Sequence, residues 1–109
     1  MRIYSYVRYN MNKNTLNEND IYELSEFYKN LSDFSRVKII TSLLKGEKCV
    51  QEIAKDVDMS QTAVSYQLRI LRHARLVKTR RDGKMIFYSI VDEHVLQILE
   101  ITIEHLEHL

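Results

Sequence analysis

Three of the chain's four histidines lie near its C-terminal end, together with an aspartate that precedes them. His94 and His105 are eleven residues apart, which places them about 20° from each other around a helix axis, and His108 follows one turn later. With Asp92, they give one helix face imidazole and carboxylate groups that can bind a metal ion. Eleven helical residues separate His94 from His105 by about 16 Å, so one chain cannot bring both to the same ion.

Cys49 is the only cysteine of the chain, so it forms neither an internal disulfide nor a metal site built from thiolates alone. Any metal must therefore be held by nitrogen and oxygen atoms. We expect Cys49 to be a small buried hydrophobic residue, with a lone redox thiol as the alternative. For the histidines the alternative is a solvated helix face, because Glu100, Glu104 and Glu107 lie among them.

A second group of residues with chemical potential is a basic stripe between residues 69 and 84. Seven basic residues stand against one acid, Asp82, a net charge of +6 in a chain whose total is +1. The basic residues are Arg69, Arg72, Arg75, Lys78, Arg80, Arg81 and Lys84. Such a stripe on an otherwise acidic molecule is typical of a surface that binds nucleic-acid phosphates, and the alternative is a solvated helix face. His73 lies within the stripe, and we expect it to be a surface residue.

The elements that position these residues are mostly helices. The chain has no proline and two glycines, and its 109 residues suffice for one domain with a single core. Residues 1–19 have no helical period and carry five asparagines, so we interpret them as a flexible arm before a domain over residues 20–109, with Met11 as an alternative start. Apolar residues at helical spacing predict helices over residues 20–32, 35–44, 49–57, 61–74 and 93–109.

Three residues mark the ends of these helices. Asp20 and Ser60 are predicted N-caps of the first and fourth helices, and Gly46 is placed to end the second in the left-handed conformation. No segment is apolar over the roughly 20 residues of a membrane span, and the polar N-terminus is unlike a secretion signal. We therefore expect a cytoplasmic protein.

The middle of the chain is typical of a winged helix-turn-helix, a mainly α fold with a small β-hairpin. Two helices joined by a short turn precede predicted strands over residues 76–81 and 85–90, and the Asp82-Gly83-Lys84 segment between the strands favours a hairpin. The second of the two helices is polar and basic outside. The last helix is apolar on more than one side, and we expect it to form a dimer interface with a partner chain together with the first helix.

Residues 31–90 closely resemble the ArsR/SmtB family of bacterial winged-helix repressors. The resemblance rests on the segments LSDFSR at the entry to the second helix, MSQTAVSYQLRIL in the fourth helix and LVKTRRDGKMIFYSI in the hairpin. Phe34 stands where many members have proline, and Tyr66 where many have histidine. The resemblance implies a homodimer whose recognition helices enter successive major grooves of a pseudo-palindromic operator.

The resemblance also implies which residues contact double-stranded DNA. Gln61 can pair with adenine, whereas Thr62 and Ser65 can reach a base or a phosphate. Tyr66 is either a DNA contact or a core residue. The other expected contacts are basic side chains of the recognition helix and the wing, namely Arg69, Arg72, Arg80, Arg81 and Lys84.

Members of the family sense metals at different places. A site on the third helix needs a pair of cysteines, and Cys49 stands alone, which disfavours arsenite, cadmium and lead. The last helix carries the D-x-H-x10-H-x2-H pattern of the zinc- and cobalt-responsive members, in Asp92, His94, His105 and His108. Two such helices packed antiparallel would place Asp92 and His94 of one chain beside the other chain's two ligands, giving two sites per dimer.

The predicted function is that of a homodimeric transcriptional repressor that zinc, or cobalt, releases from operator DNA. The alternative is a repressor of the same family with no metal or a different effector. A zinc hydrolase is disfavoured, because four protein ligands close the coordination shell that catalysis needs open to water. The sequence therefore predicts that the chain is not an enzyme.

Overall fold

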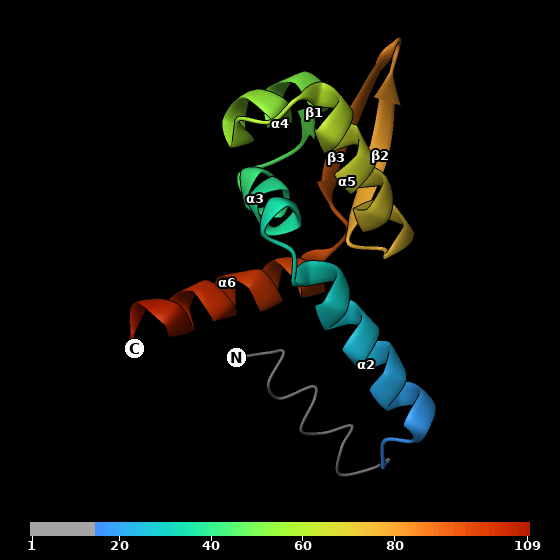
Figure 1. Ribbon diagram of the computed structural model, residues 1–109, viewed down its shortest axis with the longest axis vertical. Helices are drawn as coiled ribbons and strands as arrows, with labels where there is room; N and C mark the ends of the chain where they lie inside the picture. Colours follow the sequence, from blue (N-terminus) through green and yellow to red (C-terminus); the bar gives the residue numbers. More distant parts are fainter. Residues whose placement is uncertain (1–14) are drawn as a thin grey trace.

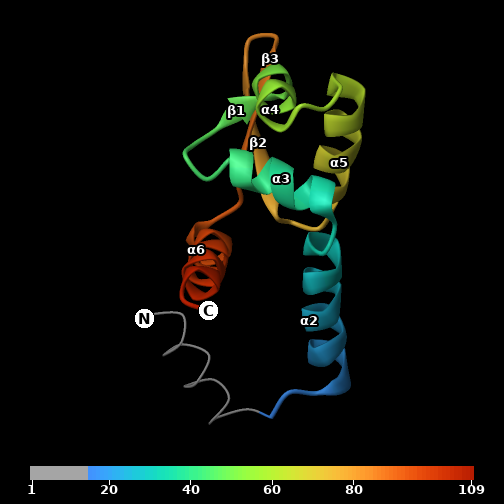
Figure 2. The same cartoon turned by 60° about the vertical axis from the view of Figure 1, so that its left-hand side comes forward.

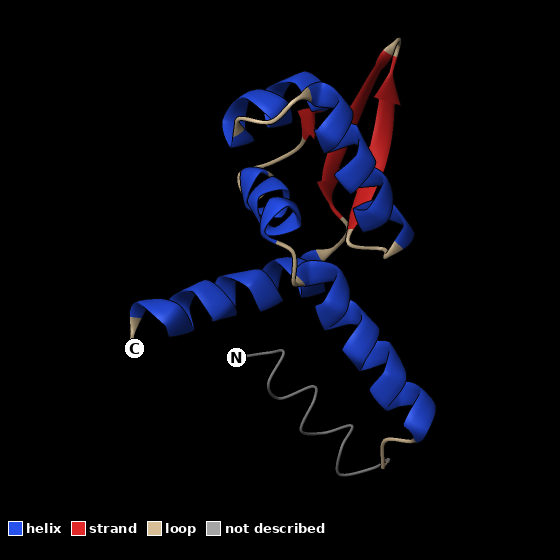
Figure 3. Ribbon diagram, viewed as in Figure 1, coloured by secondary structure: helices blue, strands red, loops and turns tan. Residues whose placement is uncertain are grey.

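A computed structural model describes residues 15–109, which form five helices and a three-stranded antiparallel sheet (Figures 1 and 3). In chain order these are α2 (Glu18–Leu31), α3 (Phe34–Ser42), β1 (Lys48–Cys49), α4 (Val50–Val57), α5 (Gln61–His73), β2 (Val77–Asp82), β3 (Met85–Ile90) and α6 (Glu93–Glu107). The predicted winged helix-turn-helix is confirmed. Residues 1–14 of the predicted arm lie outside the described residues.

The first described helix, α2, begins two residues before its predicted start. The Asn17 side chain accepts a hydrogen bond from the Asp20 backbone N–H, and the Asp20 carboxylate accepts one from the Asn17 N–H, at 2.9 and 3.0 Å. This reciprocal pair is a capping box. Asp20 is therefore the third helical residue and not the N-cap, and residues 18 and 19 are helical.

The second helix, α3, is shorter than predicted at its C-terminal end. Asp33 caps it by accepting a hydrogen bond from the Arg36 backbone N–H, and the helix ends at Ser42, with Leu43 as a right-handed C-cap. Gly46 lies beyond this end, where its N–H donates to the Leu43 carbonyl. Its φ of 143° is one that glycine favours, but Gly46 is part of the following turn and not the helix cap.

The predicted hairpin is confirmed, with β2 shifted by one residue. β2 and β3 pair antiparallel from Val77 opposite Ile90 to Asp82 opposite Met85. Gly83 has a φ of 62° at the first position of the two-residue turn, in the left-handed region where glycine has no steric cost. The hairpin projects beyond the helices as the wing of the fold (Figure 1).

Strand β1 was not predicted from the sequence. Lys48 and Cys49 pair with Tyr88 and Phe87 of β3, which makes β3 the central strand in the order β1-β3-β2. Two residues are too few for an alternating pattern to be recognised, and the prediction that Cys49 belongs to the following helix is wrong. Cys49 is 6% exposed, as expected for a small buried hydrophobic residue.

The core lies between α3, α4, α5 and the base of the wing. Its most deeply buried side chains are Ile39, Ile40, Ile53, Val64, Leu68, Leu71 and Leu76. These residues interlock the two helices of the helix-turn-helix with α3 behind them. The core therefore holds the recognition helix α5 and the wing in fixed relative positions.

Helices α2 and α6 extend away from this core, as two views of the molecule show (Figures 1 and 2). No residue of α2 is fully buried, and Val95 is the one buried residue of α6. Large apolar side chains on both helices are exposed: Ile21, Tyr22, Leu24 and Tyr28 on α2, and Ile103 and Leu106 on α6. Within residues 15–109, no helix is long and apolar enough to cross a membrane.

Candidate nucleic-acid interface and metal ligands

The recognition helix α5 starts where the sequence predicts. Asp58 adopts a left-handed conformation that ends α4, with a φ of 55°, and the Ser60 hydroxyl accepts a hydrogen bond from the Ala63 N–H at 3.1 Å. The turn between the two helices is thus closed by a helix stop and an N-cap. The cap leaves Gln61 and Thr62 in the first helical turn, where short polar side chains can approach a groove.

The polar and basic residues of α5 form one exposed face. Gln61, Thr62, Ser65, Tyr66, Arg69 and Arg72 are all exposed, and the opposite face buries Val64, Leu68 and Leu71 completely. The first five of these exposed residues line one open hollow on the surface. Tyr66 is 58% exposed, so of the two roles predicted for it the core role is wrong.

The cations of the wing are not equivalent. Arg81 and Lys84 are exposed and have no acidic partner among residues 15–109. Arg80 is exposed too, but it forms an ion pair with Glu47, whose carboxylate oxygen lies 2.5 Å from its Nη2. This role of Glu47 could not be predicted from the sequence, because the two residues are 33 positions apart and no local pattern connects them.

A second basic surface lies at the C-terminal end of α5. Arg69, Arg72, His73 and Arg75 line an open hollow there, and Arg75 has a left-handed backbone with a φ of 61°. His73 is exposed, as predicted. Most of the predicted basic stripe thus faces solvent on two adjoining elements, the recognition helix and the wing.

Asp92 and His94 lie together at the N-terminal end of α6. The Oδ1 atom of Asp92 accepts a hydrogen bond from the Val95 N–H at 3.0 Å, so Asp92 is the N-cap of α6. Its Oδ2 atom lies 3.9 Å from Nδ1 of His94, and both side chains are exposed. The capping bond occupies one carboxylate oxygen and leaves the other free to bind an ion.

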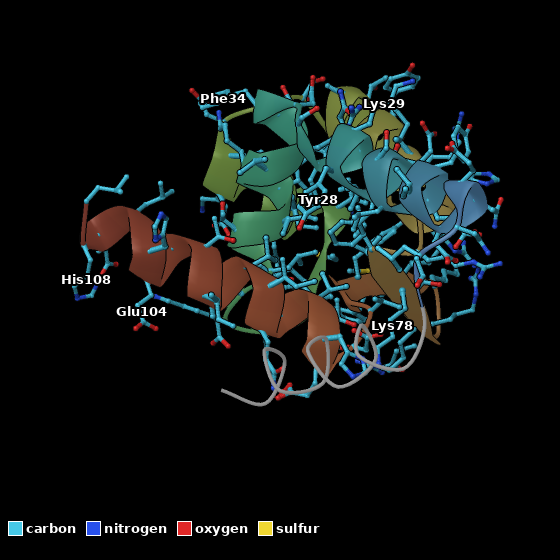
Figure 4. The ribbon with its side chains drawn as sticks, turned by 90° about the horizontal axis from the view of Figure 1, so that it is seen from below. Tyr28, Lys29, Phe34, Lys78, Glu104 and His108 are labelled. Carbon is cyan, nitrogen blue, oxygen red and sulfur yellow. The ribbon has the colours of Figure 1, made fainter. Side chains whose placement is uncertain are left out.

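His105 and His108 lie at the opposite end of the helix, where His108 points away from the core (Figure 4). Nδ1 of His108 lies 2.7 Å from the Glu104 carbonyl oxygen. A carbonyl oxygen only accepts hydrogen bonds, so Nδ1 is the donor in this contact, and in the neutral ring Nε2 is the nitrogen with the lone pair that a metal needs. This contact was not predicted from the sequence, although the four-residue spacing is that of successive helical turns.

The four predicted ligands are not brought together within one chain. Among residues 15–109, no three His, Cys, Asp or Glu side chains gather at a point that could hold a metal ion. Asp92 and His94 form one pair, and His105 and His108 lie at the far end of a helix of 15 residues. All four are exposed, so each pair is accessible to groups from outside the chain.

The comparisons with known proteins agree with this architecture. Residues 33–79 match the family of bacterial regulatory proteins described as the arsR family. A transcriptional repressor SmtB homolog of Synechocystis sp. is 41% identical over 85 residues, which cover 78% of this chain and 64% of that protein. A cadmium resistance transcriptional regulatory protein CadC homolog of Staphylococcus aureus is 38% identical over 92 residues, covering 84% of this chain and 76% of that protein.

A solved structure extends the likeness to three dimensions. The homodimeric winged helix-turn-helix DNA-binding domain of Mb0332 from Mycobacterium bovis matches with a TM-score of 0.73 and 28% identity, over 87% of this chain and 94% of that chain. The chain spans less than two thirds of the length of the Synechocystis relative. The relatives are transcriptional regulators and not enzymes. With this fold and these relatives, the chain belongs to the ArsR family of bacterial regulatory proteins.

Proposed function

We propose that this protein is a transcriptional repressor that binds operator DNA as a homodimer and is released by zinc or cobalt bound between the two α6 helices. The observation that carries the proposal is the division of four exposed candidate ligands between the two ends of α6, a helix on which Ile103 and Leu106 are also exposed. A second copy of the chain would supply the missing ligands at each end of α6 and would cover its exposed apolar residues.

The exposed face of α5 supports the DNA-binding part. Gln61, Thr62, Ser65 and Tyr66 offer hydrogen-bonding groups and an aromatic edge to a major groove, and Arg69 and Arg72 add positive charge on the same side. Arg81 and Lys84 extend that charge along the wing toward the phosphate backbone. Arg80 is already paired with Glu47, so we do not count it among the phosphate contacts.

The exposed apolar residues of α2 and α6 support the dimer. Leu106 is 59% exposed, and α2 leaves Ile21, Leu24 and Tyr28 at least half exposed. Large apolar side chains exposed on two helices that extend from the core are typical of an interaction site. A domain of the same fold from Mycobacterium bovis is homodimeric, which supports a dimer here.

The donor set fits zinc or cobalt. Asp92 and His94 of one protomer, with the partner's His105 and His108, would hold the ion through three imidazoles and one carboxylate, which suits tetrahedral zinc. The His108 ring is oriented for this role by its bond to the Glu104 carbonyl. Cys49 is buried and far along the chain from α6, so no thiolate joins the set.

Release of DNA follows from linkage. A bound ion supplies a crosslink between the two helices, and it favours the dimer geometry in which the ligands meet. In that geometry the spacing of the two recognition helices does not match the operator, so zinc weakens DNA binding. By linkage, DNA weakens zinc binding by the same factor, and the DNA-free dimer therefore binds zinc more tightly than the DNA-bound dimer.

The test is a zinc titration of the purified protein bound to operator DNA selected from a random-sequence duplex pool. Zinc should release the wild-type protein, whereas His94→Ala should bind DNA normally without zinc and stay bound when zinc is added. Glu100→Gln, an exposed non-ligand change on the same helix, is the matched control and should behave like wild type. If His94→Ala responds to zinc as wild type does, the repressor uses a different effector or none.

A further inference from the structure

Arg80 differs from the other wing cations because it has an anionic partner within the protein. Its Nε lies 3.2 and 3.1 Å from the two carboxylate oxygens of Glu47, and its Nη2 lies 2.5 Å from Oε1. Its guanidinium carbon also lies over the Phe87 ring, 4.8 Å from the centroid. The carboxylate contacts two nitrogens of the guanidinium group, and the ring packs against its face. Together these two contacts fix the orientation of the guanidinium group.

The three side chains span the width of the small sheet. Phe87 on the central strand β3 lies opposite Arg80 of β2 and opposite Cys49 of β1. Glu47 directly precedes β1. Arg80 therefore reaches across the central strand and ties β2 to the chain segment that leads into β1.

Lys48, the residue after Glu47, makes a second contact between distant parts of the chain. Lys48 forms an ion pair with Asp56 of α4, and the same carboxylate accepts a hydrogen bond from the Ser42 hydroxyl of α3. Glu47 and Lys48 are consecutive in the chain; Glu47, just before β1, holds the wing, and Lys48, in β1, holds the helix-turn-helix. Their opposite attachments follow from the alternation of side chains along an extended chain.

The pair with Glu47 also changes the charge that the wing presents. The Arg80 guanidinium holds the pKa of the Glu47 carboxyl below its ordinary value, and Glu47 raises the pKa of Arg80. Both groups are therefore charged at neutral pH, and together they contribute no net charge. Arg81, the next residue along the strand, has its side chain on the other face of the sheet.

We infer that Glu47, Arg80 and Phe87 form a lock that sets the direction of the wing and withholds the Arg80 charge from DNA phosphates. The inference rests on the proposed DNA binding. Arg80 is then a positioning residue, and Arg81 and Lys84 are the wing residues that contact phosphate. Releasing Arg80 from Glu47 adds a cation to the DNA surface and loosens the attachment of the wing.

The test measures how the logarithm of the binding constant for a fluorescent duplex of mixed sequence changes with the logarithm of salt concentration. Each phosphate contact contributes about 0.9 to this slope. Arg81→Gln should therefore lower the slope by about 0.9 per protomer, and Arg80→Gln should leave it unchanged. Glu47→Gln should raise the slope toward one further contact per protomer, and adding Arg80→Gln to it should abolish that gain.

The opposite result overturns the lock. If Arg80→Gln lowers the slope as much as Arg81→Gln does, and Glu47→Gln changes nothing, Arg80 contacts phosphate directly. ¹H–¹⁵N NMR of the free protein tests the lock without DNA. The Arg80 Nε–H signal should be sharp and protected from exchange with water in wild type, and it should broaden in Glu47→Gln. A wild-type protein that binds no duplex would refute the proposed function, and this NMR comparison would still decide whether the lock exists.

Discussion

Helices α5 and α6 are similar in length but bury their apolar residues differently. α5 buries Val64, Leu68 and Leu71 within its own chain, and its polar face is complete as it stands. α6 buries only Val95, and it leaves Ile103, Leu106 and its candidate ligands exposed. The difference separates a DNA-reading surface that one chain builds alone from a sensing surface that, under the proposed function, needs two.

The largest expected effect distinguishes these two helices by stability. Leu68→Ala removes a fully buried side chain from α5 and should lower the free energy of unfolding by about 2–5 kcal/mol at any protein concentration. Leu106→Ala should weaken the dimer interface and not the core of the protomer. It should therefore lower the free energy of unfolding clearly at protein concentrations where the wild type is dimeric, and only slightly where the wild type is monomeric. Urea denaturation at several protein concentrations checks both. Equal and concentration-independent losses would place Leu106 in the core of its own chain.

The next effect concerns assembly. A charge at Ile103, on the exposed apolar side of α6, should weaken dimerisation by at least roughly tenfold, because an unpaired carboxylate is costly to bury. Sedimentation equilibrium of Ile103→Glu measures it. Phe34→Glu is the matched control, because Phe34 is 79% exposed on α3 and belongs to neither α2 nor α6. A dimer unaffected by Ile103→Glu and disrupted by Phe34→Glu would move the interface to α3.

The third effect tests whether α6 shares its ligands between chains. His94→Ala and His105→Ala homodimers should each lose tight zinc binding, because every site then lacks one imidazole. In a mixed dimer, one site draws intact ligands from both chains while the other lacks both histidines, so about one tight zinc per dimer should return. Isothermal titration of the mixture measures this stoichiometry against about two for wild type. No recovery on mixing would mean that the ligands are not shared as proposed.

The surface formed by α5 and the wing could be predicted from the sequence more fully than the surface of α6. Ser60, the exposed face of α5 and the hairpin could be identified because caps, helical period and turn residues are local signals. The Asn17 capping box was missed because Asp20 offers the same chemistry three residues later, and a cap is defined by where its partner lies. Contacts between distant residues, such as Glu47 with Arg80, leave no periodic signal. The ligand pattern on α6 was recognisable, but its assembly depends on a second chain.

The smallest expected effect concerns the ion pairs of Glu47 with Arg80 and of Lys48 with Asp56, and it depends on pH. Lys48 and the Ser42 hydroxyl hold the pKa of Asp56 below its ordinary value of 3.8, and Arg80 does the same for Glu47, whose ordinary value is 4.5. Because these carboxyls bind protons more weakly when folded than when unfolded, they stabilise the fold above those values, and the contribution is lost as pH falls below them. Thermal unfolding followed from neutral to acidic pH should therefore show a smaller acid-induced drop in Tm for Asp56→Asn and Glu47→Gln than for wild type. Both groups are exposed, so each difference should be small. Glu93→Gln, at an exposed residue of α6 that forms no ion pair within residues 15–109, serves as the comparison. An equal reduction there would show that overall charge, and not the ion pairs of Glu47 and Lys48, sets the acid sensitivity.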